Sequence, residues 1–462
     1  MAVATALAGT DGSLANRYAA VRQELTGFGR IGGSASAVIG LPSIGRLQEL
    51  IAARPPAGLI ARGRGLSYGD AALNRDGIVV APVTAAAVDL DPDRQTVTAT
   101  ASTTFAEVLC RIVPAGFILP VLPGTGHLTV GGAIAADVHG KNHRQAGSLS
   151  AWVERVELLD GTGEVRQLSV LSDPLGLRAT VGGMGLTGVV LSATIRLRRI
   201  ETGMIHVVSR RAADLDSALS MLEATTAQYS VAWIDAAAPG RSLGRGVVEQ
   251  ADHALTADDF GAGHRLSYRQ RQPRRVPAAP VPLVTPLTAR ALGSLRFAAA
   301  ARERSRLADL ATFFHPLDAV PGWNRALACR GLVHYQFVVP LGAEAVLAEV
   351  LTSVRRQRCA PVFGTLSRFG IASGGPLSFP LTGWCLAVGV PVGQAQLSAL
   401  LTGLDMRVAE AGGRIYLADD TRLGQYAFES MYRELPGWQT VRARLDPRGV
   451  FQSDLGRRLG LC

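Results

Sequence analysis

The sequence contains no uninterrupted apolar run long enough to cross a bilayer, and its first residues lack the basic start of a secretory signal. Its five cysteines (Cys110, Cys329, Cys359, Cys385 and Cys462) are scattered and include no CxxC pair. Neither a disulfide framework nor a structural zinc site is indicated, and no metal is expected. These absences predict a soluble protein of a reducing compartment, most simply the cytoplasm.

Lysine is almost absent, because Lys141 is the only lysine among the 47 basic residues. The arginines are spread along the chain, so the net charge of +10 points to codon usage and not to a nucleic-acid partner. One basic cluster, residues 264–275, precedes the proline-rich residues 276–282. We interpret this cluster as a surface loop or active-site lid, with a weak contact to anionic lipid headgroups as the alternative.

The order of sequence patterns predicts an α+β protein with more than one domain. With 462 residues, the chain is too long for a single ordinary core. Up to about residue 200, short β-type runs alternate with glycine-rich turns, for example at 59–62, 96–101 and 152–168, with a helix at 105–113. Beyond it, helical periodicity at 213–225 and 342–357 and strand patterns at 333–339 and 384–390 predict a second lobe.

Four glycine-rich segments lie within about 130 residues of one another, at 62–70, 122–132, 139–148 and 183–188. The last of them matches the GxGxxG pattern, but a strand follows it where a dinucleotide-binding fold would have a helix. A Rossmann fold is therefore not favoured. Several glycine loops together allow backbone N–H groups to approach a pyrophosphate closely, as a large dinucleotide cofactor requires.

Ordered motifs along nearly the whole chain carry a family resemblance. They are Leu122-Pro-Gly-Thr125, Val130-Gly-Gly-Ala-Ile-Ala135, Asp137-Val-His-Gly-Lys-Asn-His143, Thr180-Val-Gly-Gly-Met-Gly-Leu-Thr-Gly188, Phe314-His-Pro-Leu-Asp318, Trp323-Asn-Arg325, Tyr335-Gln-Phe337, Pro376-Leu-Ser-Phe-Pro380, Gly412-Gly-Arg-Ile-Tyr416 and Asp446-Pro-Arg-Gly-Val-Phe451. The chain resembles flavoproteins of the vanillyl-alcohol-oxidase/PCMH superfamily, and within it the decaprenylphosphoryl-β-D-ribose 2-oxidase family. The resemblance implies a PCMH-type FAD-binding domain at 1–200, a substrate (cap) domain at 201–410 built on an antiparallel sheet with flanking helices, and a C-terminal segment at 411–462 that returns to the first domain.

The same resemblance implies the residues that would line FAD. They are Arg62, Gly63, Arg64, Gly65, Leu66, Ser67, Tyr68, Gly69, Gly124, Thr125, Thr129, Gly132, Ala135, His139, Asn142, Gly147, Gly185, Val189 and Tyr416. Superfamily members often attach FAD covalently through a histidine in an Arg-x-Gly-Gly-His segment. Leu66 occupies that position here. We therefore expect noncovalent FAD.

The chemistry implied by the resemblance is transfer of a hydride from a carbinol carbon to the flavin, with a protein group taking the hydroxyl proton. His139 is the first candidate for that base or polarising group, because it lies in the motif nearest the flavin in the relatives. Lys141 is a candidate for a hydrogen bond to flavin or substrate oxygen. The residues that match substrate-side positions are Tyr68, Trp233, Asn324 and Gln336.

The substrate-facing segments depart from the family pattern. Asp419 replaces a lysine that the relatives require for catalysis, and His334 replaces a glutamine. Ser367 replaces a second lysine, and Cys385 lies in the altered Gly-Trp-Asn-x-Cys segment, so both are assigned to the substrate pocket. Asp419 or His334 can assume the lost base role. The alternative for Asp419 is a position in solvent or an ion pair with Arg414 or Arg422.

These departures set the functional expectation. A carboxylate near the flavin would repel a phosphate and attract an ammonium or hydroxyl group. The first hypothesis is therefore an FAD-dependent oxidoreductase that oxidises a CHOH or CH2OH group of a soluble amino-bearing glycoside or nucleoside in antibiotic biosynthesis, with O2 or a reductase as electron acceptor. The alternatives are the family's own oxidation of decaprenylphosphoryl ribose in arabinose epimerisation, and a non-catalytic flavin-binding or membrane-surface paralogue.

Overall fold

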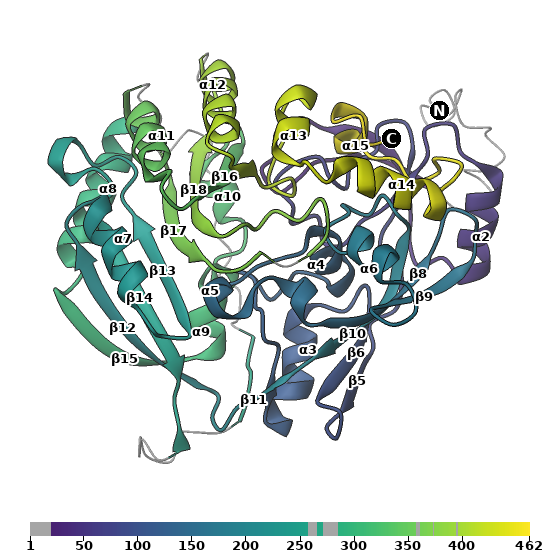
Figure 1. Ribbon diagram of the computed structural model, residues 1–462, viewed down its shortest axis with the longest axis horizontal. Coiled ribbons are helices and arrows are strands. Elements are labelled where there is room, and N and C mark those ends of the chain that lie inside the picture. Colours follow the sequence, from purple (N-terminus) through teal and green to yellow (C-terminus); the bar gives the residue numbers. More distant parts are fainter. Residues whose placement is uncertain (1–19, 257–265, 271–284, 357–360, 373, 394–395) are drawn as a thin grey trace.

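A computed structural model describes residues 20–256, 266–270, 285–356, 361–372, 374–393 and 396–462. It is a mixed α+β protein in which two groups of sheets lie side by side (Figure 1), which confirms the predicted fold class. The strands and helices expected at 59–62, 96–101, 105–113, 152–168, 213–225, 333–339, 342–357 and 384–390 are all present, within a few residues of the expected bounds. Among the described residues no helix has the length and apolar character needed to span a membrane.

The N-terminal part contains two main sheets. The first has the order β1-β2-β4-β3 and is formed by β1 (Val21–Leu25), β2 (Ser34–Ile39), β4 (Ile78–Val80) and β3 (Leu59–Ala61). The second has the order β5-β6-β10-β8-β9 and is formed by β5 (Val88–Asp91), β6 (Thr96–Thr100), β10 (Val189–Arg196), β8 (Val153–Leu159) and β9 (Val165–Ser169). A short ribbon pairs β7 (Phe117–Ile118) with β11 (Arg198–Arg199).

Five helices accompany these sheets: α2 (Ile44–Ala53), α3 (Phe105–Ile112), α4 (Val130–Ala136), α5 (His143–Ala146) and α6 (Pro174–Thr180). Helix α3 begins at a capping box in which Thr104 and Glu107 satisfy each other's backbone N–H groups. Its apolar face, which includes Phe105 and Leu109, is fully buried in the core. Helix α4 ends where Asp137 adopts a left-handed conformation with φ of 42°, which turns the chain toward His139.

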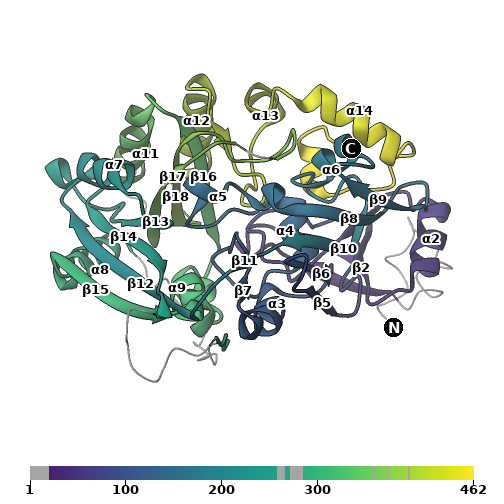
Figure 2. The same cartoon turned by 60° about the horizontal axis from the view of Figure 1, so that its bottom comes forward.

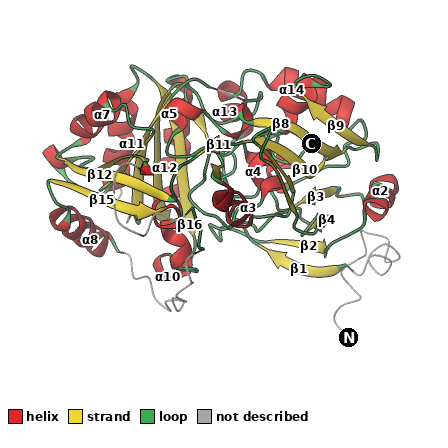
Figure 3. Cartoon of the chain, turned by 90° about the horizontal axis from the view of Figure 1, so that it is seen from below, coloured by secondary structure: helices red, strands yellow, loops and turns green. Residues whose placement is uncertain are grey.

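The cap is one antiparallel eight-stranded sheet of order β15-β12-β14-β13-β17-β18-β16-β19. Its strands are β12 (Met204–Ala212), β13 (Tyr229–Ile234), β14 (Gly246–His253), β15 (Glu303–Asp309), β16 (Leu332–Pro340), β17 (Phe363–Phe369), β18 (Gly383–Pro391) and β19 (Arg414–Ile415). Its helices are α7 (Leu215–Ala224), α8 (Pro286–Ala299), α9 (Leu310–Phe314), α10 (Trp323–Leu327), α11 (Glu344–Arg356) and α12 (Leu397–Glu410). Helices α7 and α11 lie on one side of the sheet and α8 on the other (Figures 2 and 3).

The C-terminal segment, with α13 (Gln425–Met431), α14 (Leu435–Leu445) and α15 (Asp454–Arg458), packs against the N-terminal part. Phe451 forms a parallel bridge with Leu59 of β3 and is fully buried. The guanidinium of Arg458 donates to Asp70 at 2.7 Å and to Asp420 at 2.8 Å. The C-terminal segment therefore adds a bridge at the β3 edge of the first sheet and holds the 62–70 loop in place.

We predict that Phe451→Ala lowers the free energy of unfolding by about 3–5 kcal/mol, because it leaves a cavity against β3. Thermal unfolding followed by circular dichroism measures the loss. Leu171→Ala is the control, since the Leu171 side chain is 94% exposed and its removal leaves no cavity. Equal unfolding temperatures for the two variants would contradict a stabilising role for the packing of Phe451 against β3.

Candidate active site

A cavity of about 630 Å³ lies between the N-terminal part and the cap. Most of the predicted cofactor residues line it: Arg62, Gly63, Arg64, Gly65, Leu66, Ser67, Tyr68, Gly124, Thr125, Thr129, Gly132, Ala135, His139, Gly185 and Tyr416. Three of the four glycine-rich segments thus converge on one space, and the 139–148 segment contributes only His139. Strand β16 of the cap supplies His334 and Gln336 to the opposite wall, and the loop after β19 supplies Asp419.

Four predicted cofactor residues do not line the cavity. Gly69 lies against the backbone of Asp420, where an added Cβ would meet the carbonyl oxygen at 1.6 Å. Asn142 donates to the carbonyl of Pro120 at 2.7 Å, Gly147 follows α5 with φ of 69°, and Val189 is buried at the start of β10. In this structure they shape the loops around the cavity and do not form its surface.

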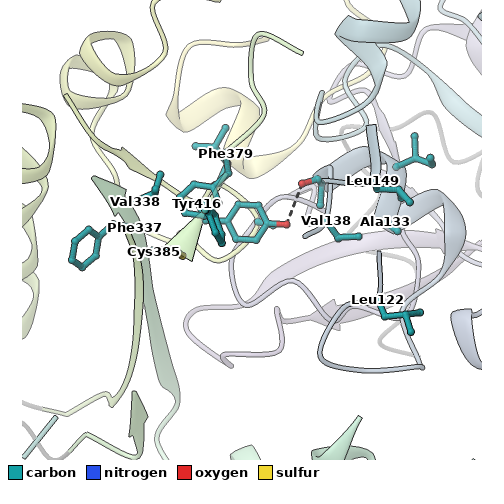
Figure 4. Close-up of a cluster of buried hydrophobic side chains, with 14 of the residues drawn as sticks. Leu122, Ala133, Val138, Leu149, Phe337, Val338, Phe379, Cys385 and Tyr416 are labelled. Carbon is teal, nitrogen blue, oxygen red and sulfur yellow. Dashed lines mark hydrogen bonds between the residues drawn. The ribbon is translucent and has the colours of Figure 1, made fainter. Parts of the chain in front are cut away.

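The cavity wall suits a large cofactor because parts of it carry no side chain. An added Cβ at Gly124 would meet no other atom within 4 Å, so its backbone borders open space. Gly65 adopts φ of 67°, which lets the 62–70 loop turn at the cavity wall. The wall is closed on the cap side by Tyr416, whose hydroxyl donates to the carbonyl of Ala136 at 3.1 Å (Figure 4).

His139 is a neutral, tightly packed imidazole. Its ring packs edge-on against Phe369, with 4.9 Å between ring centroids, and also contacts Tyr416. The Gln336 amide donates to Nε2 of His139 at 2.9 Å and to the Cys385 thiol at 3.4 Å. Burial lowers the pKa of His139 to about 4. Because Nε2 already accepts a hydrogen bond, this nitrogen is poorly placed to take a substrate proton.

His334 and Asp419 are hydrogen-bonded at the cavity wall, with 2.6 Å between Nδ1 and Oδ2. A carboxylate only accepts hydrogen bonds, so Nδ1 carries the proton and donates it to Asp419. Nε2 of His334 is then the nitrogen that can accept a proton. The Tyr68 ring lies 4.5 Å from the imidazole, centroid to centroid, and fixes its orientation further.

The alternative partners considered for Asp419 are engaged elsewhere. Arg422 makes two hydrogen bonds of 2.7 Å to Asp405, and Arg414 donates to the carbonyl of Ser378. Asp419 is also buried, so the alternative of a solvent-facing position does not describe it either. The two family departures, at 334 and 419, are therefore in direct contact with each other.

Five other predicted site residues do not line the cavity. Lys141 donates to the carbonyl of Phe313 at 2.7 Å, and Asn324 donates to the carbonyl of Phe28, also at 2.7 Å. Burial raises the pKa of the Cys385 thiol to about 12, and its neighbour across the ladder is Ser367. Trp233 lies on β13, where Arg296 covers its ring at 4.3 Å from the centroid.

Asp318 is a cavity residue that the sequence patterns did not single out. Its carboxylate accepts hydrogen bonds from the Thr125 hydroxyl at 2.6 Å and from the Gly126 N–H at 2.8 Å. It therefore links the cap to a glycine-rich segment of the N-terminal part. Its place in the motif Phe314-His-Pro-Leu-Asp318 was the available signal, but nothing in the motif indicates its partner.

Only residues 266–270 of the predicted basic loop 264–275 belong to the described part of the chain. Tyr268 is buried there, and its hydroxyl is hydrogen-bonded to Nδ1 of His315 at 2.8 Å. Residues 264, 265 and 271–275 lie outside the described residues. Among the described residues, no group of three metal-ligating side chains is suited to hold a metal ion.

Comparisons with known proteins agree with this architecture. Residues 35–169 match the family model of the FAD binding domain. The chain is 35% identical to decaprenylphosphoryl-β-D-ribose oxidase of Mycolicibacterium smegmatis over 456 residues, which is 95% of this chain and 98% of that protein. It is also 41% identical, over 367 residues, to an uncharacterised protein of the mprA 5′ region of Streptomyces coelicolor, covering 76% of this chain and 98% of that protein.

The matches cover both domains and the returning C-terminal segment, and FAD is the cofactor that the matched domain implies. The cavity lined by glycine-rich loops fits that cofactor. The chain is an FAD-dependent oxidoreductase that belongs to the PCMH-type flavoprotein family of decaprenylphosphoryl-β-D-ribose oxidase.

Proposed function

We propose that the protein oxidises a hydroxyl-bearing carbon of a sugar, with His334 and Asp419 as the proton-accepting pair. The 2.6 Å contact between these two residues at the cavity wall carries the proposal. Bound FAD supplies a hydride acceptor. The substrate C–H bond breaks with both electrons leaving as hydride, and the hydroxyl proton passes to Nε2 of His334, which leaves a carbonyl group.

Asp419 supports this step by holding the imidazole in one tautomer and by stabilising its protonated form. His139 has a different role in the proposal. Its Nε2 is occupied by Gln336, and burial keeps it uncharged, so it holds the Gln336 side chain in the cavity wall. The base role expected first for His139 is therefore assigned to His334.

The pair suits a substrate whose reacting sugar is polyhydroxylated and carries no charge near the reacting carbon. A phosphate beside the reacting carbon would face the Asp419 carboxylate in a partly buried site. An amino group, which the sequence favoured, is not required by the geometry because Oδ2 of Asp419 is already occupied by His334. The relative named for decaprenylphosphoryl ribose is expected to carry glutamine and lysine at these two positions, so the proposal places this chain on a different substrate.

We predict that His334→Gln slows the reduction of bound FAD by a productive sugar by about 10²–10⁴-fold, because the proton acceptor is lost. Asp419→Asn keeps a hydrogen-bond acceptor for Nδ1 and costs less. Anaerobic stopped-flow absorbance of the flavin band, with a panel of neutral glycosides, measures both rates without dependence on the electron acceptor.

His206→Gln is the matched control, since His206 lies on β12 of the same sheet and bonds Ser305 far from His334. Reduction at the wild-type rate in His334→Gln would remove His334 from the mechanism. Absence of flavin reduction by every glycoside in the wild-type protein would favour a non-catalytic flavoprotein.

We also propose that FAD is held noncovalently. Leu66 has no nucleophilic atom and lines the cavity where the superfamily carries the linking histidine. The protein then retains FAD only through noncovalent contacts with the glycine-rich wall of the cavity. We predict that Gly124→Leu lowers the flavin bound per protein at least tenfold, because its side chain would project into the space that the cofactor needs.

The ratio of flavin to protein absorbance after gel filtration measures retention, and acid precipitation separates released from covalently attached flavin. Gly45→Leu is the control, since an added Cβ at Gly45 on α2 also meets nothing within 4 Å but the residue lies outside the cavity. Full flavin content in Gly124→Leu, or flavin that stays with the precipitated protein, would contradict the proposal.

A further inference from the structure

Helix α8 is anchored to the cap sheet through one of its sides. Gly293 lies so close to Asp235 that an added Cβ would meet a carboxylate oxygen at 2.5 Å. The Arg245 guanidinium donates to the Ser294 hydroxyl at 2.7 Å, and Ala289 is buried about one turn before Gly293. These contacts fix which side of α8 faces the sheet, and the helix lies at the outer edge of the cap (Figures 2 and 3).

The outward side of α8 is apolar. At about 100° per residue, Leu287, Leu292 and Leu295 fall within about 140° of one another, on the side away from Ala289 and Gly293. These three leucines are 80%, 56% and 66% exposed, respectively. Single exposed leucines are common on protein surfaces, whereas several on one face of a helix indicate an interaction surface. Helix α8 therefore has the apolar pattern of a helix that is covered on both sides.

Arginines border this leucine face. Arg290 and Arg296 lie on its two sides around the helix axis, and Arg302 follows the helix. No acidic residue occurs in the sequence from the start of α8 to Arg302. Glu303 is the next acidic residue, and it pairs with Arg210 of β12 at 3.1 Å. The border of the leucine face is therefore positively charged, and α8 has no carboxylate that would neutralise it.

We propose that the leucine face of α8, formed by Leu287, Leu292 and Leu295, binds the surface of a bilayer that contains anionic lipids. The helix lies in the plane of the membrane surface. Its leucines enter the boundary between headgroups and acyl chains, and the guanidinium groups on both sides bind lipid phosphates.

The composition of the leucine face favours a lipid surface over a protein partner. The anchoring residues of protein–protein interfaces are mostly Trp, Tyr and Arg, and leucine is under-represented among them. The one aromatic residue of α8, Phe297, lies on the sheet side, where the Arg245 guanidinium is 5.0 Å from its ring centroid. A leucine face without an aromatic side chain, bordered by charge of one sign, suits an apolar layer beneath a negatively charged surface.

The leucine face is separate from the active site, since no residue of α8 lines the cavity. The inference therefore does not rest on the proposed oxidation. Binding through α8 brings the cap, and not the N-terminal part, against the bilayer (Figure 3).

Cosedimentation of the FAD-loaded protein with lipid vesicles tests the proposal. Vesicles of phosphatidylcholine and phosphatidylglycerol in equal parts supply the anionic surface, and vesicles of phosphatidylcholine alone are the neutral comparison. Leu295→Ser is expected to weaken binding to the anionic vesicles by about tenfold or more, because burial of one leucine side chain corresponds to a factor of this size. Leu171→Ser is the matched control, since Leu171 is also highly exposed but lies after β9 in the N-terminal part.

Arg290→Gln tests the charged border of the leucine face. This variant is expected to bind the anionic vesicles more weakly and to be less sensitive to added salt, because an attraction to lipid phosphates that salt screens has been lost. Arg111→Gln is its control, since Arg111 is exposed on α3 of the N-terminal part.

Absence of wild-type binding to the anionic vesicles, or equal binding to the neutral ones, overturns the proposal. Equal binding by the Leu295→Ser and Leu171→Ser proteins overturns it as well. Sedimentation velocity of the protein without vesicles examines self-association, and a dimer that Leu295→Ser converts to a monomer would assign the leucine face to a second copy instead. Leu295→Ser is expected to reduce its bound FAD at the wild-type rate, so a loss of vesicle binding is distinguishable from a failure of the proposed oxidation.

Discussion

The guanidinium of Arg458 joins three segments that are far apart in the sequence. It donates to Asp70 in the loop that lines the cavity, to Asp420, which is next to Asp419 in the sequence, and to the carbonyl of Leu423. Burial opposes its charge, yet the two carboxylates raise its pKa. The position of Asp419 relative to the 62–70 loop depends on this network, and so does the distance between the two walls of the cavity.

Much of the fold followed from local patterns. The strand and helix periodicities near 59, 105, 153 and 384 mark elements whose apolar faces are buried in the structure. The glycine-rich loops were assigned to one site because several such loops let backbone N–H groups approach a pyrophosphate closely. Their individual roles were harder to assign, since Gly69 and Gly147 lie in the same motifs as cavity residues but serve the packing of the loops.

The contact between His334 and Asp419 was beyond the reach of sequence patterns. The residues are 85 positions apart, and a strand and the loop after β19 bring them together only in the folded cap. In the sequence, His334 and Asp419 were two independent replacements of residues expected in the family. In the structure they are a single replacement, in which one hydrogen-bonded pair stands where the family's glutamine and lysine are expected. The same limit applies to Asp318, whose partners Thr125 and Gly126 lie in the other domain.

The pairing of Phe451 with β3 also bears on how the protein is made. The first sheet begins near residue 21, but its β3 strand has its outer neighbour only after Phe451 has been synthesised. Domains that fold as units during translation usually do so from the N-terminus. Here residues that leave the ribosome after the whole cap pair with β3, so this contact of the cofactor domain forms only after both domains have been synthesised.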